Sequence, residues 1–240
     1  MNEPKEDRPT ALVTGAGVRV GRAIAEELAS AGYRVWLHAW RSFDAAEALA
    51  DRLGGSAFAA DLSQVNGPAT LAAALPAGPL RLLVFSAGIY SRRRFVNVDV
   101  DDLEKMWAMH VRAPFLLTQA LLPRLRPGGS VVFVTDASVA RRSRRDDAIS
   151  HYLPSKAALE SLARTLAVEL APEVRVNAVA PGAVVFADFE DAEDRAAALA
   201  RVPLGREGDP RDVARAVRFC AESPYVTGQV IQVDGGLSVG

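Results

Sequence analysis

The stretch Thr-Gly-Ala-Gly-Val-Arg-Val-Gly at residues 14–21 lies between a short apolar run and a helical pattern of apolar residues. Gly15 permits a tight turn, and Gly21 permits the following helix to pack closely against a sheet. The free N–H groups at the start of that helix, together with its dipole, favour a pyrophosphate. A glycine-rich turn alone is weak evidence, but a strand before it and a helix after it predict a dinucleotide site.

The same alternation of strand and helix patterns continues to the end of the chain. Apolar runs predict strands at residues 11–14, 34–38, 57–60, 80–85, 130–135, 175–179 and 230–233. Helical spacing predicts helices at residues 22–30, 44–53, 99–122 and 150–170. Strands separated by helices imply right-handed crossovers and a parallel sheet covered on both faces. We therefore predict a doubly wound, Rossmann-like α/β fold in three α/β/α layers, with residues 1–240 forming a single domain.

Composition narrows the class of protein. Half of the residues are hydrophobic and the net charge is −1, so no overall field favours nucleic acid or a membrane surface. Cys220 is the only cysteine, which excludes an internal disulfide and fits a cytoplasmic location. No stretch has the pattern of a signal peptide or a membrane span. We expect a cytoplasmic protein with a small-molecule substrate, no nucleic-acid or membrane partner and no metal site.

The end of the second predicted strand indicates which dinucleotide is bound. Ala39 stands where an NAD site has a carboxylate for the ribose diol. Arg41 and Ser42 follow it and supply a cation and a hydroxyl, which suit a 2′-phosphate. Arg19 can add a second cation from the glycine-rich turn. The alternative is that Arg41 is an ordinary exposed arginine, but the missing acid favours NADPH.

Two later strand ends offer further cofactor contacts. Asp61 follows the third predicted strand, where it either accepts a hydrogen bond from the adenine amino group or serves as a helix N-cap. Ser63 could equally be that N-cap. Small residues at positions 86–88 end the fourth strand and would let the backbone run against the cofactor.

Tyr152 and Lys156 are four residues apart on a predicted helix and therefore share one face. The pair suits acid–base chemistry at a carbonyl or an imine, in which the tyrosine gives or takes the proton. We expect the neighbouring ammonium to lower the pKa of the tyrosine. Lysine occurs at only three positions of this arginine-rich chain, which favours a chemical role for Lys156.

A third polar group is expected at the end of the fifth predicted strand. Asp136 and Ser138 are two residues apart on an extended segment and can point the same way, so the residues leave both as candidates. His110 and His151 are the other polar candidates. His151 lies on a different helical face from the tyrosine, and we interpret it as an exposed loop histidine.

Over nearly its whole length the chain resembles the short-chain dehydrogenase/reductase family. The motifs that carry the resemblance are the Thr-Gly turn, Tyr152 with Lys156, Asn177 with Pro181-Gly182, and the Thr-Gly and Asp-Gly-Gly motifs at residues 227–228 and 234–236. The resemblance implies a nicotinamide cofactor contacted by the Pro-Gly loop, a catalytic Tyr and Lys, and a homo-oligomer, either a dimer or a tetramer.

Within this family the chain is similar to pteridine reductases and dihydromonapterin reductases. Residues 37–42 resemble their NADPH-phosphate segment, and Asp136 matches their catalytic aspartate. His110 stands where the wider family has a relay asparagine, and dihydromonapterin reductases have a similar histidine. The resemblance implies reduction of a dihydropterin to a tetrahydropterin, with nitrogen protonated by Tyr152. Tyr90 is placed to stack on a flat pterin.

Together, the residues and the resemblance predict two sets of site residues. The catalytic set is Tyr152, Lys156, Asp136 and Ser138. The cofactor set is Gly15, Arg19, Val20, Gly21, His38, Trp40, Arg41, Ser42, Asp61, Leu62, Ser86, Ala87, Gly88, Tyr152, Lys156, Pro181, Gly182 and Val184.

Two alternatives remain open. The first is an NADPH-dependent carbonyl reductase that acts on a 3-oxoacyl thioester. The second is a non-catalytic NADPH-binding module, against which the intact Tyr152 and Lys156 pair argues. Arginines at residues 92–94 and within 141–145 could attract an anionic substrate tail, but we interpret them as a solvated basic surface.

Overall fold

The computed structural model describes residues 8–141, 147–186 and 191–239. Its middle layer is a parallel sheet of seven strands in the order β3-β2-β1-β4-β5-β6-β7. The strands are β1 (Thr10–Thr14), β2 (Arg34–Ala39), β3 (Ser56–Ala59), β4 (Leu80–Phe85), β5 (Leu125–Val134), β6 (Val174–Pro181) and β7 (Val230–Val233). The predicted Rossmann-like fold is confirmed.

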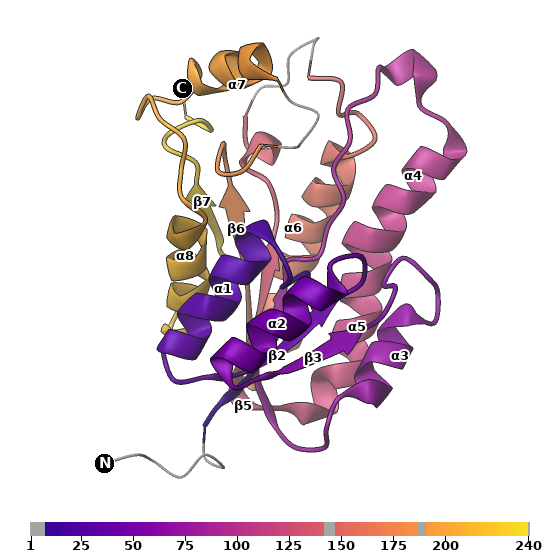
Figure 1. Ribbon diagram of the computed structural model, residues 1–240, viewed down its shortest axis with the longest axis vertical. Helices are drawn as coiled ribbons and strands as arrows, with labels where there is room; N and C mark the ends of the chain where they lie inside the picture. Colours follow the sequence, from indigo (N-terminus) through magenta and orange to yellow (C-terminus); the bar gives the residue numbers. More distant parts are fainter. Residues whose placement is uncertain (1–7, 142–146, 187–190, 240) are drawn as a thin grey trace.

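Helices cover both faces of the sheet (Figure 1). They are α1 (Arg19–Ser30), α2 (Phe43–Leu53), α3 (Gly67–Ala74), α4 (Val100–Trp107), α5 (Ala113–Leu121), α6 (Leu153–Glu169), α7 (Ala192–Leu199) and α8 (Pro210–Glu222). Alternate strand residues point to opposite faces, so Val13 packs with α1, α2 and α8, whereas Leu12 packs with α3, α5 and α6. No helix in the described ranges is long and apolar enough to cross a membrane.

The prediction of one continuous helix at residues 99–122 is wrong in detail. The structure divides it into α4, a π-helical turn (Ala108–Arg112) and α5. Pro114, in the first turn of α5, has no N–H to donate to the carbonyl four residues earlier, and a wider turn accommodates this gap. The wider turn buries His110 against the start of α6. Such turns are frequent at functional sites.

The sequence-based boundaries also miss part of β5 and three helices. β5 begins at Leu125 rather than at residue 130, and it ends at Val134, so Thr135 lies outside it. Helices α3, α7 and α8 were not predicted. The end of β5 matters for the site, because the chain leaves the extended conformation there and forms a short 3-10 turn (Ala137–Val139).

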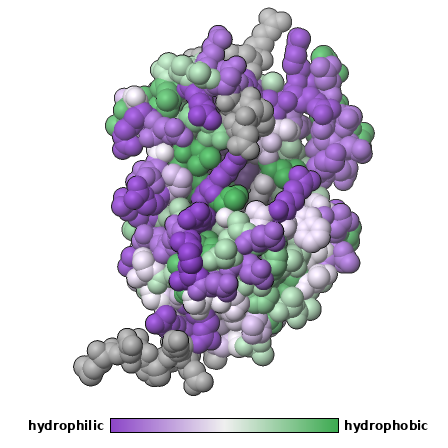
Figure 2. Space-filling view, in the orientation of Figure 1, coloured by the Kyte–Doolittle hydropathy of each residue, from purple (hydrophilic) through white to green (hydrophobic). Residues whose placement is uncertain are grey.

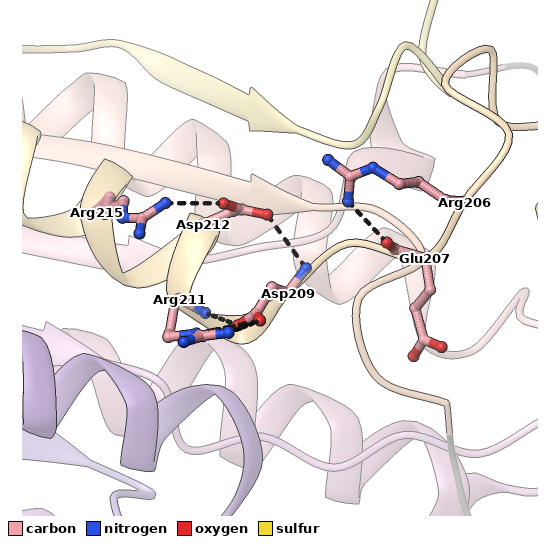
Figure 3. Close-up of polar contacts among 6 residues, drawn as sticks. All are labelled: Arg206, Glu207, Asp209, Arg211, Asp212 and Arg215. Carbon is pink, nitrogen blue, oxygen red and sulfur yellow. Dashed lines mark hydrogen bonds and ion pairs between the residues drawn. The ribbon is translucent and has the colours of Figure 1, made fainter.

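The start of α8 is defined by a capping box (Figure 3). The Asp209 carboxylate accepts from the backbone N–H of Arg211 at 2.8 Å, and its backbone N–H donates to Asp212 at 3.2 Å. The guanidinium of Arg211 also donates to the Asp209 carboxylate, and Arg215 pairs with Asp212 at 3.4 Å. These contacts satisfy N–H groups that a helix start leaves without an intrahelical partner.

Candidate active site

A cavity of about 360 Å³ opens at the carboxyl ends of β5 and β6. It lies between the start of α1 and the helix α7, where a doubly wound sheet is expected to bind its ligand. Figure 2 shows this part of the molecule hollowed, with hydrophilic and hydrophobic residues side by side around it. The cavity wall contains Arg19, Val20, Tyr90, Asp136, Ser138, Tyr152, Pro181, Gly182 and Val184 from the predicted set.

The glycine-rich turn packs tightly against the end of β4. A Cβ atom on Gly15, whose φ is +68°, would lie 2.7 Å from the Cα atom of Ala87. A Cβ atom on Gly21 would lie 2.1 Å from the carbonyl oxygen of Gly15. The Thr14 hydroxyl accepts from the backbone N–H groups of Ser86 and Ala87 at 3.2 and 3.1 Å. The turn therefore has the glycines that its geometry requires, as predicted from the sequence.

Arg19 has an unusual backbone conformation in this turn. Its φ of +52° lies in the left-handed region, which side chains other than glycine rarely occupy. The cavity wall includes its side chain and that of Val20. A strained residue at the start of α1 points to a requirement for its side chain there, and a guanidinium beside a helix N-terminus suits a phosphate group.

His38 lies behind the turn rather than facing a ligand. Burial lowers its pKa, so the ring is neutral. Its Nε2 lies 2.9 Å from the carbonyl oxygen of Ala60, and its Nδ1 accepts from the backbone N–H of Gly15 at 3.4 Å. Both ring nitrogens thus have partners within the protein, and the prediction that His38 contacts the cofactor stays a prediction that the ring itself does not support. The ring supports the turn that would do so.

The residues after β2 form an exposed edge. Trp40 and Arg41 are exposed, whereas Ala39 is buried. Ser42 lies against the turn, since a Cβ atom on Gly17 would come within 2.5 Å of its hydroxyl oxygen. No carboxylate occupies the end of β2, and a cation and a hydroxyl follow it. This arrangement fits the 2′-phosphate of NADPH.

Asp61 closes a turn after β3. Its carboxylate accepts from the backbone N–H and the hydroxyl of Ser63 at 3.0 and 2.6 Å. These bonds lower the pKa of Asp61, and the charge of Arg41 adds a smaller lowering. Helix α3 begins later, after Asn66, so neither Asp61 nor Ser63 is its N-cap. Leu62 is buried in the core, so its side chain does not face the cofactor edge.

Tyr152 and Asp136 form the central contact of the site. The Tyr152 hydroxyl donates to the Asp136 carboxylate at 2.8 Å. The Lys156 ammonium lies 5.8 Å from the centroid of the Tyr152 ring and donates to the carbonyl oxygen of Val134 at 3.1 Å. Pro154 occupies the first turn of α6, where proline is favoured, and this helix start brings the tyrosine and the lysine to one face.

The pKa of Tyr152 is raised, so the expectation that the neighbouring ammonium lowers it is wrong. Burial raises it well above 10, and the charge and hydrogen bond of Asp136 raise it further. Besides burial, the geometry explains the direction, because the phenol oxygen contacts a carboxylate while the Lys156 ammonium lies over the ring. Burial also lowers the pKa of Lys156 to about 8, and Asp136 opposes that lowering. Tyr152 is therefore a protonated phenol at neutral pH.

Ser138 lies beside Asp136 but has different partners. The backbone N–H of Ser138 donates to the Asp136 carboxylate at 2.7 Å, and its hydroxyl oxygen accepts from Arg141 at 3.2 Å. The two side chains do not follow strand alternation, because Ser138 is in the 3-10 turn after β5. Of the two candidates for the third group, Asp136 is the one hydrogen-bonded to Tyr152.

His110 joins the end of β4 to the start of α6. The backbone N–H of Ile89 donates to its Nε2 at 3.2 Å, so Nδ1 carries the ring proton and donates to the Ser155 hydroxyl at 2.8 Å. Ser155 in turn donates to the carbonyl oxygen of Tyr152 at 2.6 Å. Burial holds the pKa of His110 well below its usual value, with a further lowering by Lys156. His110 is thus a neutral connector behind the tyrosine.

The interpretation of His151 as an exposed loop histidine is wrong. His151 is buried, and its Nε2 lies 2.9 Å from the Ser91 hydroxyl. The sequence missed this contact because Ser91 lies far away along the chain. Next to Ser91, Tyr90 packs edge-on against Tyr152, with 5.0 Å between ring centroids. The segment after β4 is therefore held over the tyrosine, and Tyr90 is in the cavity wall, where a flat ligand could stack on it.

The loop after β6 closes the other side of the cavity. A Cβ atom on Gly182 would lie 2.7 Å from the Cα atom of Asp234, so glycine is required there. Asn177 joins β6 to the segment before β7, because its amide donates to the carbonyl oxygen of Val226 and accepts from the N–H of Gln229.

In the described part of the chain, no three His, Cys, Asp or Glu residues form a metal-binding group.

The comparisons with known proteins agree with this geometry. A family model described as enoyl-(acyl carrier protein) reductase matches residues 15–238. The uncharacterized oxidoreductase YmfI of Bacillus subtilis is 34% identical over 239 residues, covering 95% of this chain and 98% of its own. The chain belongs to the short-chain dehydrogenase/reductase family. It is an oxidoreductase, and the family assignment made from the sequence is confirmed.

Other relatives of this short-chain dehydrogenase/reductase have named activities. A dihydromonapterin reductase of Enterobacter sp. is 32% identical over 231 residues, or 94% of this chain and 95% of the relative. Among solved structures, FolM alternative dihydrofolate reductase 1 from Brucella canis complexed with NADP has a TM-score of 0.86 at 31% identity, covering 99% and 97% of the two chains. The angucycline C-6 ketoreductase LanV with bound NADP has a TM-score of 0.90 at 32% identity, with coverages of 97% and 96%.

Other charged residues in the cavity wall were not predicted as site residues, namely Arg92, Arg141, Asp147, Asp194 and Arg201. Arg92 pairs with Asp194 on α7 at 2.7 Å, and Arg141 pairs with Asp147 at 2.8 Å. For Arg141 the interpretation as solvated surface is therefore wrong, since its side chain is only 9% exposed, whereas Arg92, at 29%, is partly solvated. Arginines 142, 144 and 145 lie outside the described residues. No local motif predicts these ion pairs. Arg92 and Asp194 are far apart in the sequence, and the spacing of Arg141 and Asp147 matches no recognised motif.

Proposed function

We propose that this short-chain dehydrogenase/reductase uses NADPH to reduce a dihydropterin to a tetrahydropterin. The observation that carries the proposal is the 2.8 Å hydrogen bond from the Tyr152 hydroxyl to the Asp136 carboxylate. A ketone needs only hydrogen-bond donors at its oxygen. A dihydropterin also has ring N–H groups, and a carboxylate beside the tyrosine can accept from one of them.

The cofactor end fits NADPH. The tight turn at Gly15 and the backbone N–H groups at the start of α1 suit the pyrophosphate, and Arg19, Arg41 and Ser42 suit the 2′-phosphate. Ala39 supplies no carboxylate to repel that phosphate. When bound, NADPH supplies the hydride. Lys156 would hold the ribose hydroxyls next to the nicotinamide, with the loop at Gly182 on the other side.

The proton would come from Tyr152. Because its pKa is raised, the phenol stays protonated at neutral pH and is a donor rather than a base. A weak acid of this kind protonates an imine nitrogen more readily than a carbonyl oxygen, because the nitrogen is the stronger base. Asp136 lies at the other end of the same hydrogen bond and can orient the phenol. Lys156, over the ring, would stabilise the tyrosinate left after proton transfer.

The comparisons support this proposal and also its main alternative. A dihydromonapterin reductase and FolM proteins are among the relatives, but so is the ketoreductase LanV at similar identity. Identity alone therefore does not choose between an imine and a ketone. The contact between Tyr152 and Asp136, with Tyr90 beside it in the cavity wall, favours the flat nitrogen heterocycle.

The proposal is tested by following NADPH oxidation with a dihydropterin and, separately, with a 3-oxoacyl thioester. We expect kcat/KM for the dihydropterin to exceed that for the thioester. Turnover of the thioester alone would make the protein a carbonyl reductase. Tight binding of NADPH with no turnover of either compound, or of any other carbonyl or imine, would make it a non-catalytic binding module.

The proposal includes a homo-oligomer in the cytoplasm. Helices α4 and α5 leave Leu103, Trp107 and Phe115 about half exposed, and a second subunit packed on these helices would cover them. The buried thiol of Cys220 fits a reducing compartment. Light scattering coupled to size-exclusion chromatography would give the mass of a dimer or a tetramer, and the mass of a monomer would contradict the oligomer.

A further inference from the structure

Arg141 is held inside the cavity wall by two contacts. Its Nε donates to the hydroxyl oxygen of Ser138 at 3.2 Å, and its Nη1 lies 2.8 Å from a carboxylate oxygen of Asp147. The side chains of Arg141 and Asp147 are 9% and 10% exposed, so solvent screens their interaction less than it screens a surface pair. The guanidinium is planar and rigid, so fixing Nη1 also fixes the direction in which Nε–H points.

Asp147 is itself held from a second side. Its other carboxylate oxygen lies 3.4 Å from Nη1 of Arg201, just beyond α7. The ion pairs therefore join the turn after β5, the segment at Asp147 and the end of α7 around one cavity. All three residues are in the cavity wall, and Arg141 is the one that donates a hydrogen bond to Ser138.

The contacts of Ser138 determine what its hydroxyl can do. Its backbone N–H donates to the Asp136 carboxylate, and its hydroxyl oxygen accepts from Nε–H of Arg141 through one lone pair. Within the described ranges, no hydrogen bond from its O–H is recorded, and the residue is in the cavity wall. Since Nε–H occupies one side of the oxygen, the O–H is left to donate to a ligand. A hydroxyl that accepts a hydrogen bond is a stronger donor.

We propose that Arg141 is a positioning residue that sets the Ser138 hydroxyl as a donor to the substrate, next to the Asp136 carboxylate as an acceptor. This inference rests on the proposed function, because it assigns the recognised part of the substrate. A donor and an acceptor side by side complement a heterocycle edge with an acceptor nitrogen or oxygen adjacent to an N–H, such as an amidine or a lactam. A simple ketone offers only the acceptor.

A double-mutant cycle tests the proposal. The variants are Arg141→Met, Ser138→Ala and the two combined, and the measurements are kcat and KM for a dihydropterin. We expect each single change to lower kcat/KM by about tenfold, the usual worth of one net hydrogen bond. The double variant should lose no more than either single variant, because Arg141 acts only through Ser138. Losses that multiply would overturn the proposal, and so would an Arg141→Met enzyme of normal kcat/KM.

Two further variants separate positioning from folding. Arg141→Lys keeps a cation for Asp147 but has no Nε–H for Ser138, so it should keep the Tm and still lose activity. Full activity in Arg141→Lys would show that charge, and not the contact with Ser138, matters. Arg92→Met is the matched control, since Arg92 is in the same wall and pairs with Asp194 without contacting Ser138. It should lower kcat/KM equally in the wild-type and Ser138→Ala backgrounds, or not at all.

The experiment distinguishes this inference from the proposed function. Reduction of a dihydropterin by the unmodified protein decides the proposed function before any variant is made. If only a 3-oxoacyl thioester is reduced, the same cycle is run on that substrate, whose carbonyl oxygen can also accept from Ser138. If neither is reduced, the cycle is run on the dissociation constant of a dihydropterin from the NADP-loaded protein. In every case, independent effects of Arg141 and Ser138 overturn the inference.

Discussion

At the scale of single residues, the partners of Tyr152 distinguish this site from one in which a serine hydroxyl contacts the tyrosine. The phenol donates to Asp136, and the Ser138 hydroxyl instead accepts from Arg141. The Asp136 carboxylate can thus orient the phenol and can also accept a proton. The cost is a phenol that ionises less readily than a free tyrosine, because burial and the carboxylate both raise its pKa.

We expect Asp136→Asn to lower kcat/KM for a dihydropterin on the order of 100-fold or more, close to the effect of Tyr152→Phe, because both changes disrupt the proton donor. Ser138→Ala should cost only about tenfold, the worth of one hydrogen bond. Steady-state kinetics with NADPH at saturation measures all three. If Ser138→Ala loses most of its kcat/KM while Asp136→Asn keeps it, the site is an ordinary carbonyl-reducing one.

Arg41 should decide the choice of coenzyme. We expect the protein to prefer NADPH to NADH, and Arg41→Ala to weaken NADPH about 10- to 100-fold while leaving NADH nearly unchanged. Fluorescence titration of both coenzymes gives the four dissociation constants. Arg52→Ala, at an exposed arginine that pairs with Glu26 on the surface, is the control and should change neither. Equal affinity of the wild-type protein for the two coenzymes would contradict the argument from Ala39.

Lys156 should give two opposite dependences on pH. Its pKa of about 8 lies below the ordinary value of 10.5, so the ammonium is lost as pH rises through 8. NADPH affinity that depends on this charge should be full below pH 8 and fall about tenfold per unit above it. In the same range the unfolded chain binds more protons than the folded chain, so the contribution of Lys156 to the stability of the cofactor-free protein should rise. Lys156→Met should remove both trends, and a flat affinity profile in the wild-type protein would exclude this role of its charge.

At the scale of elements, the sequence predicts best where a pattern is local. The turn at Gly15 and the helix face shared by Tyr152 and Lys156 could be predicted, because each is set by neighbours within a few residues. The break before α5 could not be placed, since Pro114 signals an irregularity but not the π-helical turn that resolves it. That turn is what buries His110.

The helices that were not predicted from the sequence escaped detection for different reasons. Helix α3 is short and rich in alanine and has no apolar stripe to detect. Helix α8 could have been predicted, because Val213, Val217 and Cys220 recur at helical spacing and are all buried. The pairs made by Arg141 and Arg201 with Asp147 depend on how separate segments meet, and no spacing along the chain reveals that.

The capping box of α8 should contribute measurably to stability. Asp209→Ala removes the acceptor for the N–H groups at the helix start and should lower the Tm by a few degrees, whereas Asp209→Asn can still cap and should lower it less. Hydrogen bonds from Arg211 hold the pKa of Asp209 at about 2. Since this value is below that of a free carboxyl, the contribution should be present above pH 4 and lost as pH falls toward 2. Thermal melts at several pH values would show this, and an unchanged Tm in Asp209→Ala at neutral pH would contradict it.

At the scale of the whole molecule, a parallel sheet with helices on both faces follows from alternating strands and helices with right-handed crossovers, and this much could be predicted. The order of the strands could not, because the alternation does not say on which side of β1 each later strand is added. The prediction of a single domain is tested by unfolding, which should occur in one cooperative transition. NADPH at about 100 times its dissociation constant should stabilise the folded protein by about 2.7 kcal/mol and raise the Tm by roughly 5–10 °C. NADH at the same concentration should raise it less. Two transitions, of which NADPH shifts only one, would indicate separate folding units.

The pairing of β1 with β4 has a consequence for how the protein is made. Ala11 is opposite Leu82, and the Thr14 hydroxyl accepts from the backbone of Ser86 and Ala87. A chain emerging from the ribosome therefore cannot complete its glycine-rich turn until β4 has also emerged. The opposite wall of the cavity forms only after β7 has been synthesised, because Gly182 packs on Asp234, which follows that strand. A complete pocket thus requires the chain up to Asp234, and a nascent chain released before β7 would have the residues of the turn but only part of the pocket.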